Sequence, residues 1–75
     1  MTEEQISYLN KQLKLINEHA TNISIDLNDL KHADITMTEE DKKQTVKGML
    51  IDSLKLKISA NGLFNELMRK VEMDE

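Results

Sequence analysis

Two histidines and their acidic neighbours are the residues of this 75-residue chain best suited to bind a metal. His19 and His32 are thirteen residues apart, so in a helix they would lie near opposite ends and could not hold one ion together. Asp29 and His32 would share a helix face, with Asp34 close by, and could supply two or three ligands. Pairs of this kind also occur by chance on any charged helix. We therefore expect no metal site and no cofactor.

Three consecutive acids, Glu39, Glu40 and Asp41, are the strongest candidates for general acid–base catalysis. They directly follow Thr38, whose side chain suits a helix N-cap, and the helix dipole stabilises acids in the first turn. Catalytic carboxylates also need a pocket, and slim helices with only two aromatic residues in the chain form little concavity. The sequence therefore predicts no catalytic residues and no enzyme activity.

The chain has mixed charge, with a net charge of −4, and its lysines are interspersed with acids. A protein that binds nucleic acid directly needs a basic patch to neutralise phosphates, and the sequence offers none. No apolar run approaches the length of a membrane span, the first residues are acidic where a secretory signal would be basic, and Cys is absent. We expect a cytoplasmic protein that binds neither nucleic acid nor membranes.

The elements that must position these side chains are helices. Apolar residues recur at intervals of three and four, the spacing of a heptad repeat that packs along another helix. This first seam consists of Ile6, Leu9, Leu13, Ile16, Ala20, Ile23, Leu27 and Leu30. Thr2 as N-cap, with Gln5 three residues later, forms a capping-box pattern, so the sequence predicts a helix over about residues 3–33.

A second helix is predicted over about residues 39–73, after a short connection at 34–37. So short a link folds two long helices back on each other as an antiparallel helical hairpin with coiled-coil-like packing, an all-α single domain over 1–75. The second seam consists of Val46, Leu50, Leu54, Phe64, Leu67 and Val71. The last residues, 72–75, are mostly acidic at the negative end of a helix dipole, so this tail should fray.

Gly62 leaves two alternatives open for the second helix. Asn61 and Gly62 have the pattern of a helix terminator, which would leave a short third helix from Leu63 to about Met73. Alternatively, the helix continues and tolerates Gly62 at a cost of about 1 kcal/mol. The heptad register continues across Gly62, which favours a continuous helix with a bend or weak point there, although Lys57 would then lie on the seam.

The apolar residues of the second helix cover well over half of its circumference, which is more than one partner helix can cover. A short chain without disulfides or a metal gains a larger core by association. The sequence therefore predicts a homo-oligomer, most simply a twofold dimer that forms a four-helix bundle. Three residues toward one edge of the apolar arc are the candidate contacts for another protein: Met49, Leu56 and Leu63.

Three functions fit these features. The leading hypothesis is a non-enzymatic protein that binds and regulates or inhibits a larger protein through a helical surface. The alternatives are a structural coiled-coil or scaffolding subunit, whose whole apolar arc serves self-assembly, and an acidic DNA mimic that blocks a nucleic-acid-binding protein. The small acidic helical format and the frequent Asn, Lys and Ile residues resemble accessory proteins of phages and mobile elements of AT-rich bacteria, a resemblance of composition that identifies no activity.

Overall fold

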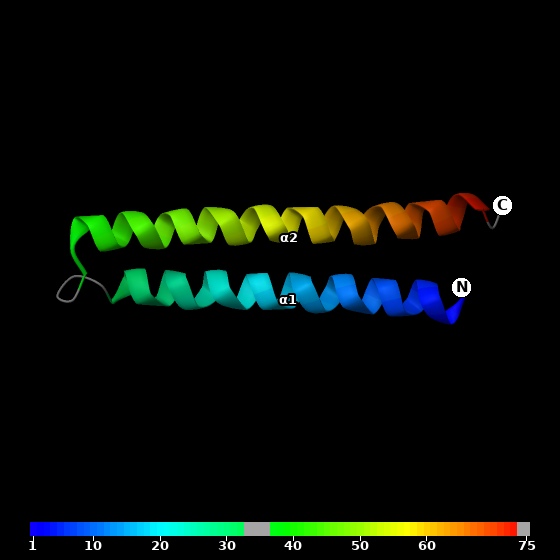
Figure 1. Ribbon diagram of the computed structural model, residues 1–75, viewed down its shortest axis with the longest axis horizontal. Helices are drawn as coiled ribbons and strands as arrows, with labels where there is room; N and C mark the ends of the chain where they lie inside the picture. The colour runs from blue at the N-terminus through cyan, green and yellow to red at the C-terminus, as the bar shows by residue number, and fades with distance from the viewer. Residues whose placement is uncertain (33–36, 74–75) are drawn as a thin grey trace.

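The chain folds into two long helices that lie side by side and antiparallel, so that both termini are at the same end of the molecule (Figure 1). The computed structural model describes residues 1–32 and 37–73, with α1 spanning Glu3–Lys31 and α2 spanning Glu39–Met73. Within these two ranges there is no strand. The predicted all-α helical hairpin is confirmed, and it measures 57 × 16 × 14 Å.

Both helices begin at the predicted threonine caps. Thr2 accepts a hydrogen bond from the backbone N–H of Gln5 at 3.1 Å, and the Gln5 side chain accepts one from the Thr2 N–H at 2.7 Å. Thr38 and Asp41 form the same reciprocal pair at the start of α2, at 3.1 and 3.3 Å. Each pair satisfies N–H groups that the first turn of a helix leaves without an internal partner.

The far end of α1 comes slightly earlier than the sequence predicts, at Lys31. The backbone N–H of His32 caps this end by donating to carbonyl groups of the last turn. Apart from Met37, the predicted connection at 34–37 lies outside the described residues, as do the last two residues of the predicted tail at 72–75.

Gly62 lies inside α2, which continues without a break along its whole length. Of the two alternatives for this region, the structure therefore has the continuous helix. A Cβ atom at Gly62 would lie 2.9 Å from the hydroxyl oxygen of Tyr8 and 3.7 Å from the side chain of Gln12. The missing side chain at Gly62 thus allows the two helices to approach closely and does not serve a turn.

Four rows of residues, each with heptad spacing, form the contact between the helices. In α1 both rows are half-buried. The polar row is Gln5, Gln12, His19 and Asp26, and the apolar row is Leu9, Ile16, Ile23 and Leu30. In α2 the polar row is Thr45, Asp52, Ser59 and Glu66, and the apolar row is Met49, Leu56 and Leu63. We call these the polar rows and the inner apolar rows. Half of the contact is therefore polar, and none of the large side chains described is fully buried.

Candidate interaction surface

The structure divides the first seam between two sides of α1. One half of it is the inner apolar row, which packs against α2. The other half is exposed and consists of Ile6, Leu13, Ala20 and Leu27. Every residue of the second seam is exposed as well, and Leu50 retains 69% of its accessible surface. The hairpin thus covers half of the first seam and leaves the whole second seam open.

The exposed rows of the two helices lie on the same side of the hairpin. In each helix the exposed row comes one residue after the polar row, as Ile6 follows Gln5. Antiparallel helices in contact are related by an approximate twofold axis normal to the plane of the hairpin, so rows with equal phase lie on the same side. We call this surface the apolar face. Its exposed residues are Ile6, Leu13, Ala20 and Leu27 of α1 and Val46, Leu50, Phe64, Leu67 and Val71 of α2, and it includes the half-buried Ala60.

The apolar stripe of each helix is turned away from the other helix. Neighbouring rows of a heptad lie about 51° apart around a helix. The stripe of α1 consists of its inner apolar row and its exposed row, and its centre lies roughly 50° around the helix from the direction of α2. The centre of the stripe of α2 lies at least as far from the direction of α1, on the same side of the hairpin. In a four-helix bundle the central axis lies about 45° from the direction of each neighbouring helix. The two stripes converge beside the hairpin, as two helices of a four-helix bundle do.

The chain has a large surface for its size because the hairpin is long and thin. Its accessible surface is 5961 Å², whereas a compact protein of the same mass exposes about 4,700 Å². Its Cα radius of gyration is 17.0 Å, against about 11 Å for a compact chain of this length. The excess surface is about 1,200 Å² per chain.

The three predicted contacts for another protein, Met49, Leu56 and Leu63, are half-buried against α1 because they form the inner apolar row of α2. A different set of aliphatic residues is exposed on the far side of α2. We call this set the outer patch, and it consists of Ile51, Leu54 and Ile58, which are 54%, 57% and 62% exposed. Leu54 is thus the one residue of the second seam that lies on the outer patch and not on the apolar face. Residues at these spacings share one helix face. The side of α2 that has the outer patch is about opposite the side that faces the point where the two apolar stripes converge.

Lysines surround the outer patch. Lys47 and Lys55 lie beside it, and both are exposed. Over residues 42–65 the chain has five lysines and a single acid, Asp52, which faces α1. Lys47 and Lys55 therefore make the border of the outer patch basic, although the net charge of the chain is −4. Lys42 is half-buried, and Lys43 and Lys57 lie on the side of the apolar face. A count of charges along the sequence misses this surface because it does not separate the outward lysines from the inward acid.

His19 and Asp52 form a polar contact between the helices that the sequence analysis does not single out. Their Nδ1 and Oδ1 atoms lie 3.3 Å apart, and the side chains are only 17% and 19% exposed. A partly buried polar pair of this kind favours one register of two helices, because sliding either helix leaves both groups without a partner. The heptad spacing of the two polar rows is the signal that could have revealed it.

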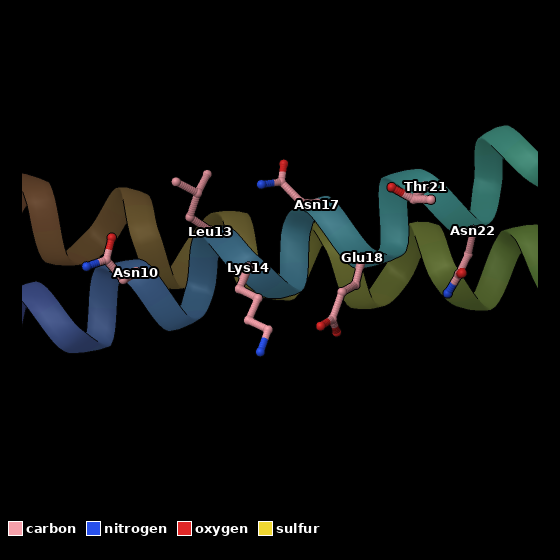
Figure 2. Close-up of a pocket in the computed structure, with 7 residues that line it drawn as sticks. All are labelled: Asn10, Leu13, Lys14, Asn17, Glu18, Thr21 and Asn22. Atoms are coloured by element: carbon pink, nitrogen blue, oxygen red, sulfur yellow. The ribbon is translucent and has the colours of Figure 1, made fainter.

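Two hollows in the surface lack the convergent groups that a catalytic centre needs. One lies on the outer side of α1 and is lined by seven residues of that helix alone, whose side chains point in different directions (Figure 2). Its charged residues are Lys14 and Glu18, and Leu13 at its edge belongs to the apolar face. The other, at the open end of the hairpin, includes Glu66 and Arg69, which form an ion pair at 3.1 Å.

Apart from His19, the described residues considered for metal binding and acid–base chemistry are exposed, and Glu39 and Glu40 line a hollow of α2 together with Lys42, Lys43 and Val46. Asp29 and His32 are exposed near the end of α1, and Asp34 is outside the described residues. Glu39 and Glu40 are exposed in the first turn of α2. In the part of the chain that the structure describes, no three or more His, Cys, Asp or Glu side chains are grouped so that they could hold a metal ion.

Comparison with other proteins adds no relative: no protein-family model, curated protein or solved structure matches this chain. Neither described helix combines the length and the apolar character needed to cross a membrane. The surface features with a distinct chemistry are thus the apolar face and the lysine-bordered outer patch.

Proposed function

We propose that this protein is a non-enzymatic, self-associating helical hairpin that binds and regulates a larger protein. The observation that carries this proposal is the division of the exposed apolar residues into two surfaces. The apolar face is turned toward an axis beside the hairpin, whereas the outer patch lies on the opposite side of α2. In the proposed assembly a second copy covers the apolar face, which leaves the outer patch for another protein.

The apolar face fits a second copy of the chain. One hairpin supplies two of the four apolar stripes that a four-helix bundle needs, and a twofold-related copy supplies the other two. A chain of this length with an uncovered apolar face buries too little apolar surface to be stable alone, so folding and association should occur together.

Light scattering coupled to gel filtration tests the self-association. At micromolar concentration we expect a single species with twice the 8.7 kDa mass of the chain. A folded, helical monomer would contradict this part of the proposal, and circular dichroism of the same fractions establishes whether the species is helical.

The outer patch fits a groove on another protein. Ile51, Leu54 and Ile58 have the i, i+3, i+7 spacing with which a helix fills an apolar groove. The neighbouring lysines favour carboxylates around that groove, because opposite charges steer the encounter and exclude wrong partners. Since the patch lies outside the proposed bundle, dimer formation leaves it accessible. The expected partner is therefore a protein with an apolar groove bordered by Asp and Glu residues.

Affinity capture from cells of the source organism, repeated with two variants, tests the outer patch. We expect Leu54→Asp to lose the dominant protein that the unchanged chain retains, because the charge would enter an apolar groove. Ile25→Asp is the matched control: Ile25 is 54% exposed but lies on α1. Both variants should remain dimeric and helical, and Lys55→Glu should weaken capture less than Leu54→Asp.

Other outcomes of the capture would support the alternative functions. A protein that is retained by both variants but released by moderate salt would favour the acidic DNA mimic, since screening weakens exposed charge contacts. If the protein is a dimer and Leu54→Asp removes no captured protein, the scaffolding subunit would be favoured. Either result would contradict the proposed docking through the outer patch.

A further inference from the structure

We infer that the second copy binds with its α2 antiparallel to α2 of the first copy, and its α1 antiparallel to α1. The open ends of the two hairpins then lie at opposite ends of the bundle. This arrangement rests on the proposed self-association and specifies which helix faces which across the interface.

On each helix, one row borders the apolar face on the side farthest from the other helix, and the polarity of this row differs between α1 and α2. In α1 this row is polar and exposed, and it consists of Asn10, Asn17 and Ser24. In α2 the corresponding row is exposed and has three apolar residues among five, and it consists of Lys43, Leu50, Lys57, Phe64 and Val71. Each helix of a four-helix bundle has two neighbours, and this row borders the neighbour that belongs to the second copy.

The chemistry of these rows selects the neighbour. If α2 lay beside α1 of the second copy, Phe64 and Val71 would face asparagine side chains, and the amides would lose water without gaining a partner. With α2 beside α2 and the twofold axis near the middle of the helix, Leu50 lies beside Phe64 of the second copy, and the burial of this apolar pair is favourable. The asparagines of the two α1 helices then face one another, where amide groups can both donate and accept hydrogen bonds.

Distances between spin labels on single cysteines test the arrangement cleanly, because the chain has no native cysteine. Lys57 and Lys43 occupy the same exposed row of α2, near the middle and near the start of the helix. In the inferred dimer, the two labels of Lys57→Cys should lie within about 20 Å of each other. Those of Lys43→Cys should be roughly 40 Å apart, because antiparallel copies carry them to opposite ends.

The same pattern is expected on the other helix, with Asn17→Cys giving the short distance and Lys31→Cys the long one. This second pair decides the result if a label in α2 disturbs folding, which circular dichroism of each labelled variant reveals. Equal distances of about 15 Å at both positions of a pair would place α2 beside α1 of the second copy and overturn the inference while leaving the dimer intact. A monomeric mass without a distance between chains would instead overturn the self-association itself.

Discussion

The contact between the two helices and the apolar face are both built from heptad rows, but they differ in chemistry. The contact contains a full set of polar rows, the most buried residue in it is Ser59, and Gly62 replaces a side chain where the helices approach. The apolar face has aliphatic side chains and Phe64 instead. Polar and small residues select one partner and one register, whereas large apolar residues supply buried area. The contact within the hairpin therefore sets the register of the two helices, whereas the proposed dimer would supply most of the free energy of folding.

The largest expected effect separates these two regions. Leu13→Asp places a charge in the middle of the apolar face, although Leu13 is 48% exposed in the hairpin. In the proposed dimer that charge is buried without a partner, which should cost several kcal/mol and abolish folding and association together. Circular dichroism and light scattering should show loss of helix and loss of the dimer at the same time.

Leu15→Asp is the matched control for this prediction. Leu15 is half-buried in the hairpin, and so is more buried there than Leu13, but it lies on the side away from the apolar face. We expect its effect to be the smaller of the two. If the hairpin were stable alone, the order would reverse and Leu15→Asp would cause the greater loss of helix, a result that would contradict the role given to the apolar face.

The sequence was sufficient to predict the helices, because their local signals agree. The threonine caps mark both starts, and the apolar periodicity carries α2 through Gly62, as observed. It was not sufficient to predict which side of each helix packs against the other. Periodicity gives the direction of an apolar stripe on a helix. When two neighbouring helices cover the stripe, each of them contacts only part of it. The first seam is divided in this way.

The residues predicted to contact another protein are less exposed than other apolar residues of α2, for the same reason. Met49, Leu56 and Leu63 are apolar in the right arc of α2, yet the hairpin half-buries them. The lysines beside Leu54 form a distinct surface only after Asp52 has been placed in the contact between the helices. Recognition of the polar rows as a heptad feature would have shown which of these residues face α1 and which face outward.

A moderate effect is expected at the polar pair. Asp52→Ala removes the partner of His19 and should lower the free energy of unfolding by about 1 kcal/mol, the net contribution of a partly buried hydrogen bond. Urea unfolding measures this change. In a double-mutant cycle, His19→Ala should add little once Asp52 is absent. Fully additive losses would mean that the 3.3 Å contact does not couple the helices.

The smallest expected effect concerns the two glycines of α2 and tests whether the close approach of α1 restricts a side chain at Gly62. Gly48→Ala should stabilise the protein by about 1 kcal/mol, since alanine favours a helix interior, and its Cβ would meet Asp26 at an ordinary 3.9 Å. Gly62→Ala should gain less, because its Cβ would lie 2.9 Å from the Tyr8 hydroxyl, which must move. In a Tyr8→Phe background the two gains should become similar. Equal gains in the unchanged background would mean that Tyr8 does not restrict Gly62.

The dependence of unfolding on protein concentration tests most directly the claim that the apolar face is covered by a second copy. If folding and dimer formation are one event, the urea midpoint followed by circular dichroism should rise steadily between about 1 and 100 µM protein, because association shifts the folding equilibrium by mass action. A midpoint that stays the same over this range, in a chain that remains helical, would show that the hairpin is stable alone and would contradict the account.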